Sequence, residues 1–198
     1  MTLQDVKKIV ENLIDIKVGF AELTLLGGEP TINPQFVEIV DYLSKFKGQL
    51  YTILRVITNG TNLKPHIVES FRKLDYVVLS LYPDTKSIID KMKKSGLYEY
   101  FDNNLTFNIW YSKEFFVYGT GGESDRLGNW EKCWAKKRCR NLDSSGLYMC
   151  YILYGKKMNV CNLTNQQEVV DYFKTESFSL CEFCTQPPPT EPWENNGN

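Results

Sequence analysis

Three near-continuous apolar runs, each followed by an amphipathic segment, constrain the fold of this chain more than any other feature. The runs are AELTLL at 21–26, YTILRVIT at 51–58 and YVVLSL at 76–81. Buried parallel strands read as continuous apolar stretches, so the alternation predicts a parallel α/β sheet covered by helices. Ligands in such folds bind at the carboxyl ends of the strands, which draws attention to the loops that follow the runs.

Helix signals between the runs support this arrangement. Thr2, with Asp5 three residues later, is typical of a helix start and predicts a helix to about residue 16. Asn33 as cap and Pro34 as first helical residue predict a second helix, which Gly48 closes. Two further helices are expected from about residue 65 and over residues 86–96.

The periodicity changes after about residue 102 and indicates a second part of the chain. LTFNIWYS at 105–112 and EFFVYG at 114–119 are expected strands, and GTGGESD at 119–125 is interpreted as a flexible connection. We therefore predict three parts: residues 1–118 with the repeated strand and helix pattern, residues 119–186 with all the cysteines, and a disordered proline-rich tail at 187–198.

Composition excludes several classes of partner. The 198 residues are 42% hydrophobic and 24% charged, with a net charge of -1, which gives no electrostatic attraction to nucleic acid or to an anionic membrane. There is no apolar run of membrane-spanning length and no signal-peptide core near Met1, so we expect a cytoplasmic protein. The single histidine, His66, falls in a predicted first helical turn and is interpreted as a surface residue. A histidine-dependent hydrolase or a Cys2His2 zinc site would have only this histidine to use, so the sequence argues against both.

Six cysteines in the last third of the chain form the most distinctive cluster of reactive residues. A reducing compartment favours metal ligands over disulfides. The C-x2-C pair formed by the last two of the six cysteines is the strongest indication of a metal site. Four thiolates suit either tetrahedral zinc or an iron–sulfur cubane, and spacing does not choose between them. A hairpin turning at Gly155 is also predicted, with Cys150 and Cys161 directly opposed. The candidate ligands are Cys133, Cys139, Cys150, Cys161, Cys181 and Cys184.

Motifs at the ends of the predicted strands add a second set of distinctive residues to these cysteines. The turn GGEP at 27–30 follows the first run, TNGT at 58–61 follows the second, and LSLYPD at 79–84 belongs to the third. With the cysteine-rich segment, the sequence resembles the radical S-adenosylmethionine (SAM) enzymes that carry a C-terminal auxiliary iron–sulfur domain of the twitch or SPASM type. The resemblance implies an incomplete parallel (β/α) barrel, a partial TIM barrel, with a small cysteine-rich hairpin domain.

The resemblance also implies roles for individual residues. In the family, the backbone of the glycine turn contacts the amino group of SAM, and the acid of the motif helps to hold it. Glycines let main-chain carbonyls approach a small cation closely, and a carboxylate complements its charge. Two polar residues at the ends of the next strands are assigned to the cofactor by position alone. The implied SAM-binding residues are Gly27, Gly28, Glu29, Pro30, Asn59 and Ser80.

The cysteine-rich segment resembles the auxiliary-cluster pattern, in which two early cysteines precede a G-x-x-x-C strand and a later C-x2-C closes the site. One cubane uses four ligands, so the resemblance leaves open which of the six cysteines bind, and whether Cys161 is among them.

One family feature is missing from this sequence. Radical SAM enzymes hold their catalytic [4Fe-4S] cluster in a C-x3-C-x2-C loop after the first barrel strand, and no cysteine precedes Cys133 here. Without its first strand, the sheet would leave one apolar edge unpaired. We therefore expect a fragment, a misplaced start or a partner chain that supplies the strand, with a degenerate relative as the alternative.

Two functional hypotheses follow. The first is a radical SAM oxidoreductase that binds SAM and an auxiliary [4Fe-4S] cluster, modifies a peptide, sugar or small molecule, and uses an electron donor. The second is a non-catalytic relative or interaction module whose cysteines hold zinc.

Overall fold

The structure of the protein is a computed structural model that divides into two compact units, Met1–Glu114 and Phe115–Asn198. Most of the helix predicted at 86–96, most of the strand predicted at 114–119 and the tail at 187–198 lie outside the described residues. The described residues are 1–81, 90, 93–94, 96, 105–109, 119–120, 124–133, 140–150, 155, 157–175, 177–182 and 184–185.

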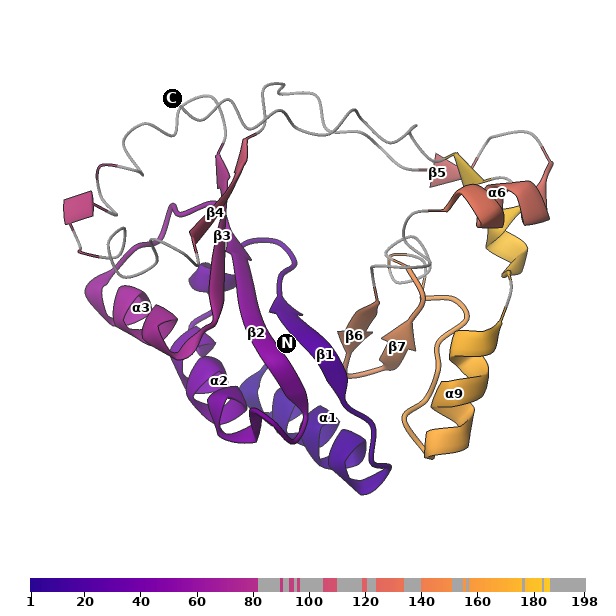
Figure 1. The fold of residues 1–198 in the computed structure, drawn as a ribbon, viewed down its shortest axis with the longest axis horizontal. Helices are drawn as coiled ribbons and strands as arrows, with labels where there is room; N and C mark the ends of the chain where they lie inside the picture. Colours follow the sequence, from indigo (N-terminus) through magenta and orange to yellow (C-terminus); the bar gives the residue numbers. More distant parts are fainter. Residues whose placement is uncertain are drawn as a thin grey trace. The chain divides into compact units, whose positions relative to one another are not determined.

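The first unit contains a four-stranded parallel sheet (Figure 1). The strands lie in the order β1-β2-β3-β4, so each strand pairs with the next one along the chain. Consecutive parallel strands require crossover segments between them, as the sequence predicted. The bounds are β1 Phe20–Leu25, β2 Tyr51–Thr58, β3 Tyr76–Leu81 and β4 Leu105–Ile109. The prediction of a parallel α/β sheet is therefore confirmed.

Helices α1 (Leu3–Asp15), α2 (Phe36–Leu43) and α3 (Pro65–Ser70) pack along one face of this sheet (Figure 1). Burial along β2 alternates accordingly, because Leu54, Val56 and Thr58 are buried and the residues between them are half-buried. The short helices η1 (Pro30–Ile32), η2 (Ser44–Phe46) and η3 (Phe71–Lys73) complete the connections.

Helix α1 begins where the sequence predicts. Thr2 Oγ1 accepts a hydrogen bond from Asp5 N at 3.2 Å, and the Asp5 carboxylate accepts one from Thr2 N at 2.7 Å. This reciprocal capping box satisfies donors that the first helical turn leaves free.

The second predicted helix starts later than expected. Asn33 Oδ1 accepts a hydrogen bond from Gln35 N at 2.9 Å, and α2 begins only at Phe36. The prediction of Pro34 as its first residue is wrong, because the Asn33 side chain stabilises a separate turn after η1.

The second unit is built from short elements around a small aromatic core. Strand β5 (Gly119–Thr120) pairs with β8 (Cys184–Thr185), and β6 (Asn141–Asp143) forms a tight hairpin with β7 (Gly146–Tyr148). The helices are α6 (Arg126–Lys132), α9 (Gln166–Lys174) and η4 (Ser179–Cys181). Tyr148, Met149 and Phe178 form the core, and Trp130, Cys150, Val160, Tyr172 and Cys181 pack against it.

The predicted pairing of Cys150 with Cys161 is wrong. Cys161 lies opposite Leu147 instead, with Cys161 N donating to Leu147 O at 2.8 Å and Leu147 N donating to Cys161 O at 2.9 Å. The cause is that Met149 and Cys150 have already left the strand in a bend, where Tyr172 Oη accepts a hydrogen bond from Met149 N. None of the helices in the described part of the chain has the length and apolar character needed to cross a bilayer.

Candidate functional site

The glycine turn after β1 is exposed and has a left-handed backbone conformation. Gly27 has a φ of 103° and Gly28 a φ of 54°, values that favour glycine. No atom lies within 4 Å of the position that a Cβ would take at either residue. Among the residues that the structure describes, none forms a hydrogen bond with the backbone of Gly27 or Gly28. The turn therefore presents free main-chain donors and acceptors to open space.

Glu29 anchors this turn through its carboxylate. Oε1 accepts hydrogen bonds from Thr31 N at 3.1 Å, from Thr31 Oγ1 at 2.6 Å and from Thr58 Oγ1 at 2.6 Å. Oε2 accepts one from Asn59 N at 2.7 Å. Two of the donors lie at the end of β2, so one side chain joins the loops at the carboxyl ends of two neighbouring strands.

The loop after β2 is shaped by its own polar side chains. Asn59 Oδ1 accepts hydrogen bonds from Thr61 N at 2.9 Å and from Thr61 Oγ1 at 2.7 Å. Asn62 Nδ2 donates to Thr31 O and adds a second link between the two loops. The structure thus brings Asn59 close to Glu29, although it is the backbone of Asn59 that makes the contact.

Ser80 lies at the same level of the sheet on the next strand. The register pairs Thr58 with Leu79, so Ser80 follows one residue later, level with Asn59. Its side chain is buried, and among the described residues it has no hydrogen-bond partner. Pro30 is the first residue of η1, directly after Glu29. The contacts of SAM with these residues stay a prediction.

The prediction from sequence missed the residues that hold Glu29 in place. Thr31, Thr58 and Asn62 were not singled out, although each is a polar residue within or next to a motif that was. Thr31 and Thr58 are each only 1% exposed. The sequence feature that could have indicated them is a hydroxyl residue at the end of an apolar strand or next to the acid of a motif.

Four of the six cysteines lie on or next to short elements of the second unit. Cys133 caps the end of α6, Cys181 ends η4, Cys184 begins β8, and Cys150 follows β7. Asn129 Nδ2 donates to Cys181 O at 3.0 Å and to Glu182 O at 3.1 Å, which fixes α6 against η4.

The pKa of the Cys181 thiol depends on its burial and on the other three of these cysteines. Burial raises the pKa of the Cys181 thiol, and repulsion from Cys150, Cys184 and Cys133 raises it further. In the described part of the chain, no three ligand-type side chains are close enough together to hold a single metal ion.

Cys161 is separate from this group. Its thiol lies against α9, and burial, followed by the charge of Glu168, raises its pKa to about 11. Cys161 Sγ donates weakly to Asn162 O at 3.7 Å. A buried, protonated thiol of this kind packs as a small hydrophobic residue. Cys139 lies outside the described residues.

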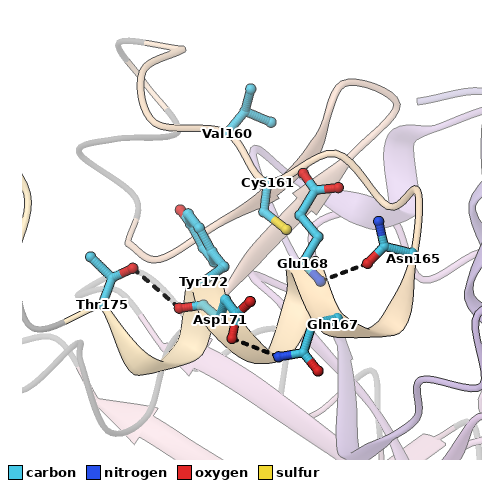
Figure 2. A pocket seen from close by; sticks show the side chains of 8 residues that line it. All are labelled: Val160, Cys161, Asn165, Gln167, Glu168, Asp171, Tyr172 and Thr175. Atoms are coloured by element: carbon cyan, nitrogen blue, oxygen red, sulfur yellow. Dashed lines mark hydrogen bonds between the residues drawn. The ribbon is translucent and has the colours of Figure 1, made fainter.

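A pocket of about 560 Å³ opens beside Cys161 (Figure 2). Figure 2 shows the side chains of Glu168 and Asp171 along α9, with Gln167 Nε2 donating to Asp171 at 2.7 Å. The Tyr172 phenol also lines it, and burial raises the pKa of this group to about 12. The pocket therefore offers carboxylates and neutral groups at physiological pH, without a thiolate.

A parallel sheet that carries an open glycine turn and a firmly held carboxylate at its carboxyl end defines an α/β protein suited to bind a small cofactor. The chain belongs to the Radical SAM superfamily, whose sequence profile matches residues 1–106. The predicted membership of this superfamily is confirmed.

Two curated relatives match part of the chain. "Mycofactocin maturase MftC" of Mycobacterium tuberculosis is 26% identical over 101 residues, which is 50% of this chain and 24% of that protein. "S-adenosylmethionine-dependent nucleotide dehydratase" of Flammeovirga pacifica is 36% identical over 75 residues, 37% of this chain and 24% of that protein. The matches span about a quarter of the length of these relatives.

Solved structures of BtrN share the fold. BtrN in complex with AdoMet and 2-DOIA superposes with a TM-score of 0.60 at 14% identity, and selenomethionine BtrN in an open conformation with a TM-score of 0.58 at 12% identity. Each comparison covers 94% of this chain and 80% of BtrN. Sequence identities this low carry the fold and nothing beyond it.

Proposed function

We propose that this chain forms the SAM-binding core and auxiliary domain of a radical SAM oxidoreductase. The observation that carries the proposal is the turn at Gly27 and Gly28, whose free backbone faces open space next to Glu29 in the segment that matches the superfamily. Exposed carbonyls and a carboxylate are the groups that complement the ammonium of an amino acid.

The residues present fit SAM in the following way. The backbone of Gly27 and Gly28 would bind the α-amino group of the cofactor, with Glu29 adding negative charge beside it. Asn59 and Ser80, level with one another at the strand ends, would line the neighbouring part of the site. When bound and reduced at an iron–sulfur cluster, SAM supplies the 5′-deoxyadenosyl radical that activates a substrate C–H bond.

The proposed reaction needs groups beyond these residues. No cysteine precedes Cys133, so the catalytic cluster would be held by a C-x3-C-x2-C segment outside this sequence, on the same protein or on a partner chain. An electron donor would reduce that cluster. The proposed substrate is a peptide, a sugar or a small molecule, and a curated relative bears the name of a nucleotide dehydratase.

We assign the auxiliary [4Fe-4S] cluster to four of the six cysteines. The mutual repulsion around Cys181 and the hydrogen bonds of Asn129 support the set Cys133, Cys150, Cys181 and Cys184. Cys161 is left out because its thiol lies against α9 and its backbone pairs with Leu147. Four thiolates also suit zinc, which is the cofactor of the alternative function, a non-catalytic interaction module.

The SAM site is tested by calorimetric titration of SAM into the full chain. We expect the wild-type protein to bind SAM and Gly27→Val to bind at least about tenfold more weakly, because its side chain fills the space beside the turn. Gly48→Val is the matched control, since Gly48 has a φ of 83° and equally open surroundings but lies before the amino end of β2, away from the carboxyl ends of the strands. Wild-type protein that does not bind SAM would overturn the proposal.

The cluster is tested by iron, sulfide and zinc analysis with visible spectra after anaerobic reconstitution. We expect about four irons and four sulfides per chain, as in one cubane. Cys181→Ser should lose the brown absorption, whereas Cys161→Ser should keep it. One bound zinc in a colourless protein would favour the alternative function instead.

A further inference from the structure

We propose that Thr58 is a positioning residue for the cofactor, acting through Glu29 to fix the glycine turn. This inference rests on the proposed SAM site and deepens it. It assigns the Glu29 carboxylate mainly to joining the two loops, and the binding of the cofactor's ammonium mainly to the backbone of the turn.

The first step is the hydrogen-bonding capacity of Glu29. An ionised carboxylate offers about four acceptor positions, two on each oxygen. Oε1 already accepts from Thr31 N, Thr31 Oγ1 and Thr58 Oγ1, and Oε2 accepts from Asn59 N. Only Oε2 keeps an acceptor position, so the protein itself satisfies most of this charge.

The second step concerns what holds the turn. Gly27 and Gly28 have positive φ values, and no described residue bonds to their backbone. Their conformation therefore depends on the residue that follows, and Glu29 is tied to the end of β2. Within the described part of the chain, the recorded links between the two loops are the bonds of Glu29 and that of Asn62 to Thr31 O.

The third step concerns how much the Thr58 hydroxyl contributes to holding Glu29 in place. Thr58 is 1% exposed, and its hydroxyl donates to Glu29 Oε1 at 2.6 Å while accepting from Gly60 N at 3.1 Å. A short bond to a carboxylate is among the stronger hydrogen bonds in proteins. Removing the buried hydroxyl leaves a charged acceptor less well satisfied, and Glu29 can relax away from its position.

The consequence is that Thr58 affects the affinity for the cofactor without contacting it. If Glu29 moves, the carbonyls of Gly27 and Gly28 lose the orientation that binding of an ammonium requires. Thr58→Val should then weaken SAM binding although the charge of Glu29 is unchanged.

The experiment compares Thr58→Val, Thr58→Ser and Thr24→Val in the full chain by SAM titration and by hydrogen exchange of residues 26–31. We expect about tenfold weaker SAM binding and faster exchange for Thr58→Val, with binding restored by Thr58→Ser, which keeps the hydroxyl. Thr24→Val is the matched control, because Thr24 Oγ1 also donates to a carboxylate, that of Glu22 at 2.8 Å. It should leave binding and exchange unchanged.

The two readouts separate the failure of this inference from that of the proposed function. Wild-type binding with Thr58→Val equally tight and its exchange unchanged overturns the positioning role alone. If the wild type does not bind SAM but Thr58→Val exchanges faster, the proposed SAM site is overturned, whereas the role of Thr58 in joining the two loops is supported. If Thr58→Val does not fold, Thr31→Val removes another hydroxyl from the same oxygen, and we expect a smaller effect in the same direction.

Discussion

At Gly146 in the second unit, a side chain is excluded by the backbone of a distant segment. A Cβ there would lie 2.4 Å from Cys161 O and 2.8 Å from Val160 Cγ2, and the φ of Gly146 is 135°. The glycine of the G-x-x-x-C motif thus lets the Cys161 segment pair with Leu147. The requirement is one of backbone packing.

We predict that Gly146→Ala lowers the free energy of unfolding of the second unit by about 2 kcal/mol or more, because strain and steric overlap add. Gly155→Ala is the control, since no atom lies within 4 Å of its Cβ position. Urea unfolding followed by circular dichroism measures both. Equal stability of the two variants would contradict the close approach of Cys161 to Gly146.

Tyr172 is a second single residue with a structural role, because it positions the candidate cluster ligand Cys150. Its hydroxyl accepts from Met149 N at 2.8 Å and donates to Asn159 O at 2.6 Å, which fixes the bend that carries Cys150. We predict that Tyr172→Phe shifts the electron paramagnetic resonance g values of the reduced auxiliary cluster while the iron content stays the same. The control Tyr76→Phe alters a tyrosine on β3 and should leave the spectrum unchanged. An unchanged spectrum of Tyr172→Phe would contradict a role of this hydroxyl in positioning a ligand of the cluster.

At the scale of elements, the sequence predicted what local patterns determine. The apolar runs gave β1, β2 and β3 close to their observed bounds, and Thr2 with Asp5 gave the start of α1. The start of α2 was missed because the Asn33 side chain favoured a separate turn. The register of Cys161 was missed because it depends on a distant contact with Gly146 and Leu147, which no local pattern encodes.

Tyr51 connects β2 to α2 and makes this packing sensitive to alkali. Its hydroxyl donates to Leu43 O at 2.8 Å, and burial, followed by the charge of Asp75, raises its pKa to about 12. The folded state then keeps a proton that the unfolded state loses above about pH 10. The stabilisation is therefore complete below about pH 10 and is lost as the pH rises toward 12.

We predict that Tyr51→Phe is less stable than the wild type by about 1 kcal/mol at about pH 9, because the hydrogen bond to Leu43 is lost. The difference should shrink as the pH rises through about 10 to 12, since only the wild type has this phenol to ionise. Urea unfolding of both proteins across this range measures it. A difference that does not change with pH would contradict the raised pKa of Tyr51.

At the scale of the whole molecule, the candidate sites fall in different units. Met1–Glu114 contains the residues proposed for SAM, and Phe115–Asn198 contains all six cysteines. From the change in periodicity and the position of the cysteines, the sequence predicted a boundary between residues 118 and 119, whereas the two compact units meet between Glu114 and Phe115. The sequence left open which four cysteines bind a cluster, because spacing along the chain does not fix how residues on separate short elements, such as Cys133, Cys150 and Cys181, are arranged.

Each unit has its own hydrophobic core, so each ligand should stabilise mainly the unit that binds it. We predict that SAM slows hydrogen exchange around residues 26–31 and 58–62 and leaves α9 unchanged. Removal of the auxiliary cluster by a chelator should speed exchange in α9 and η4 and leave α1 and α2 unchanged. Peptide-resolved mass spectrometry of the full chain, with and without each ligand, measures both effects. Faster exchange in α1 after cluster removal would contradict this prediction and mean that the cluster stabilises both units.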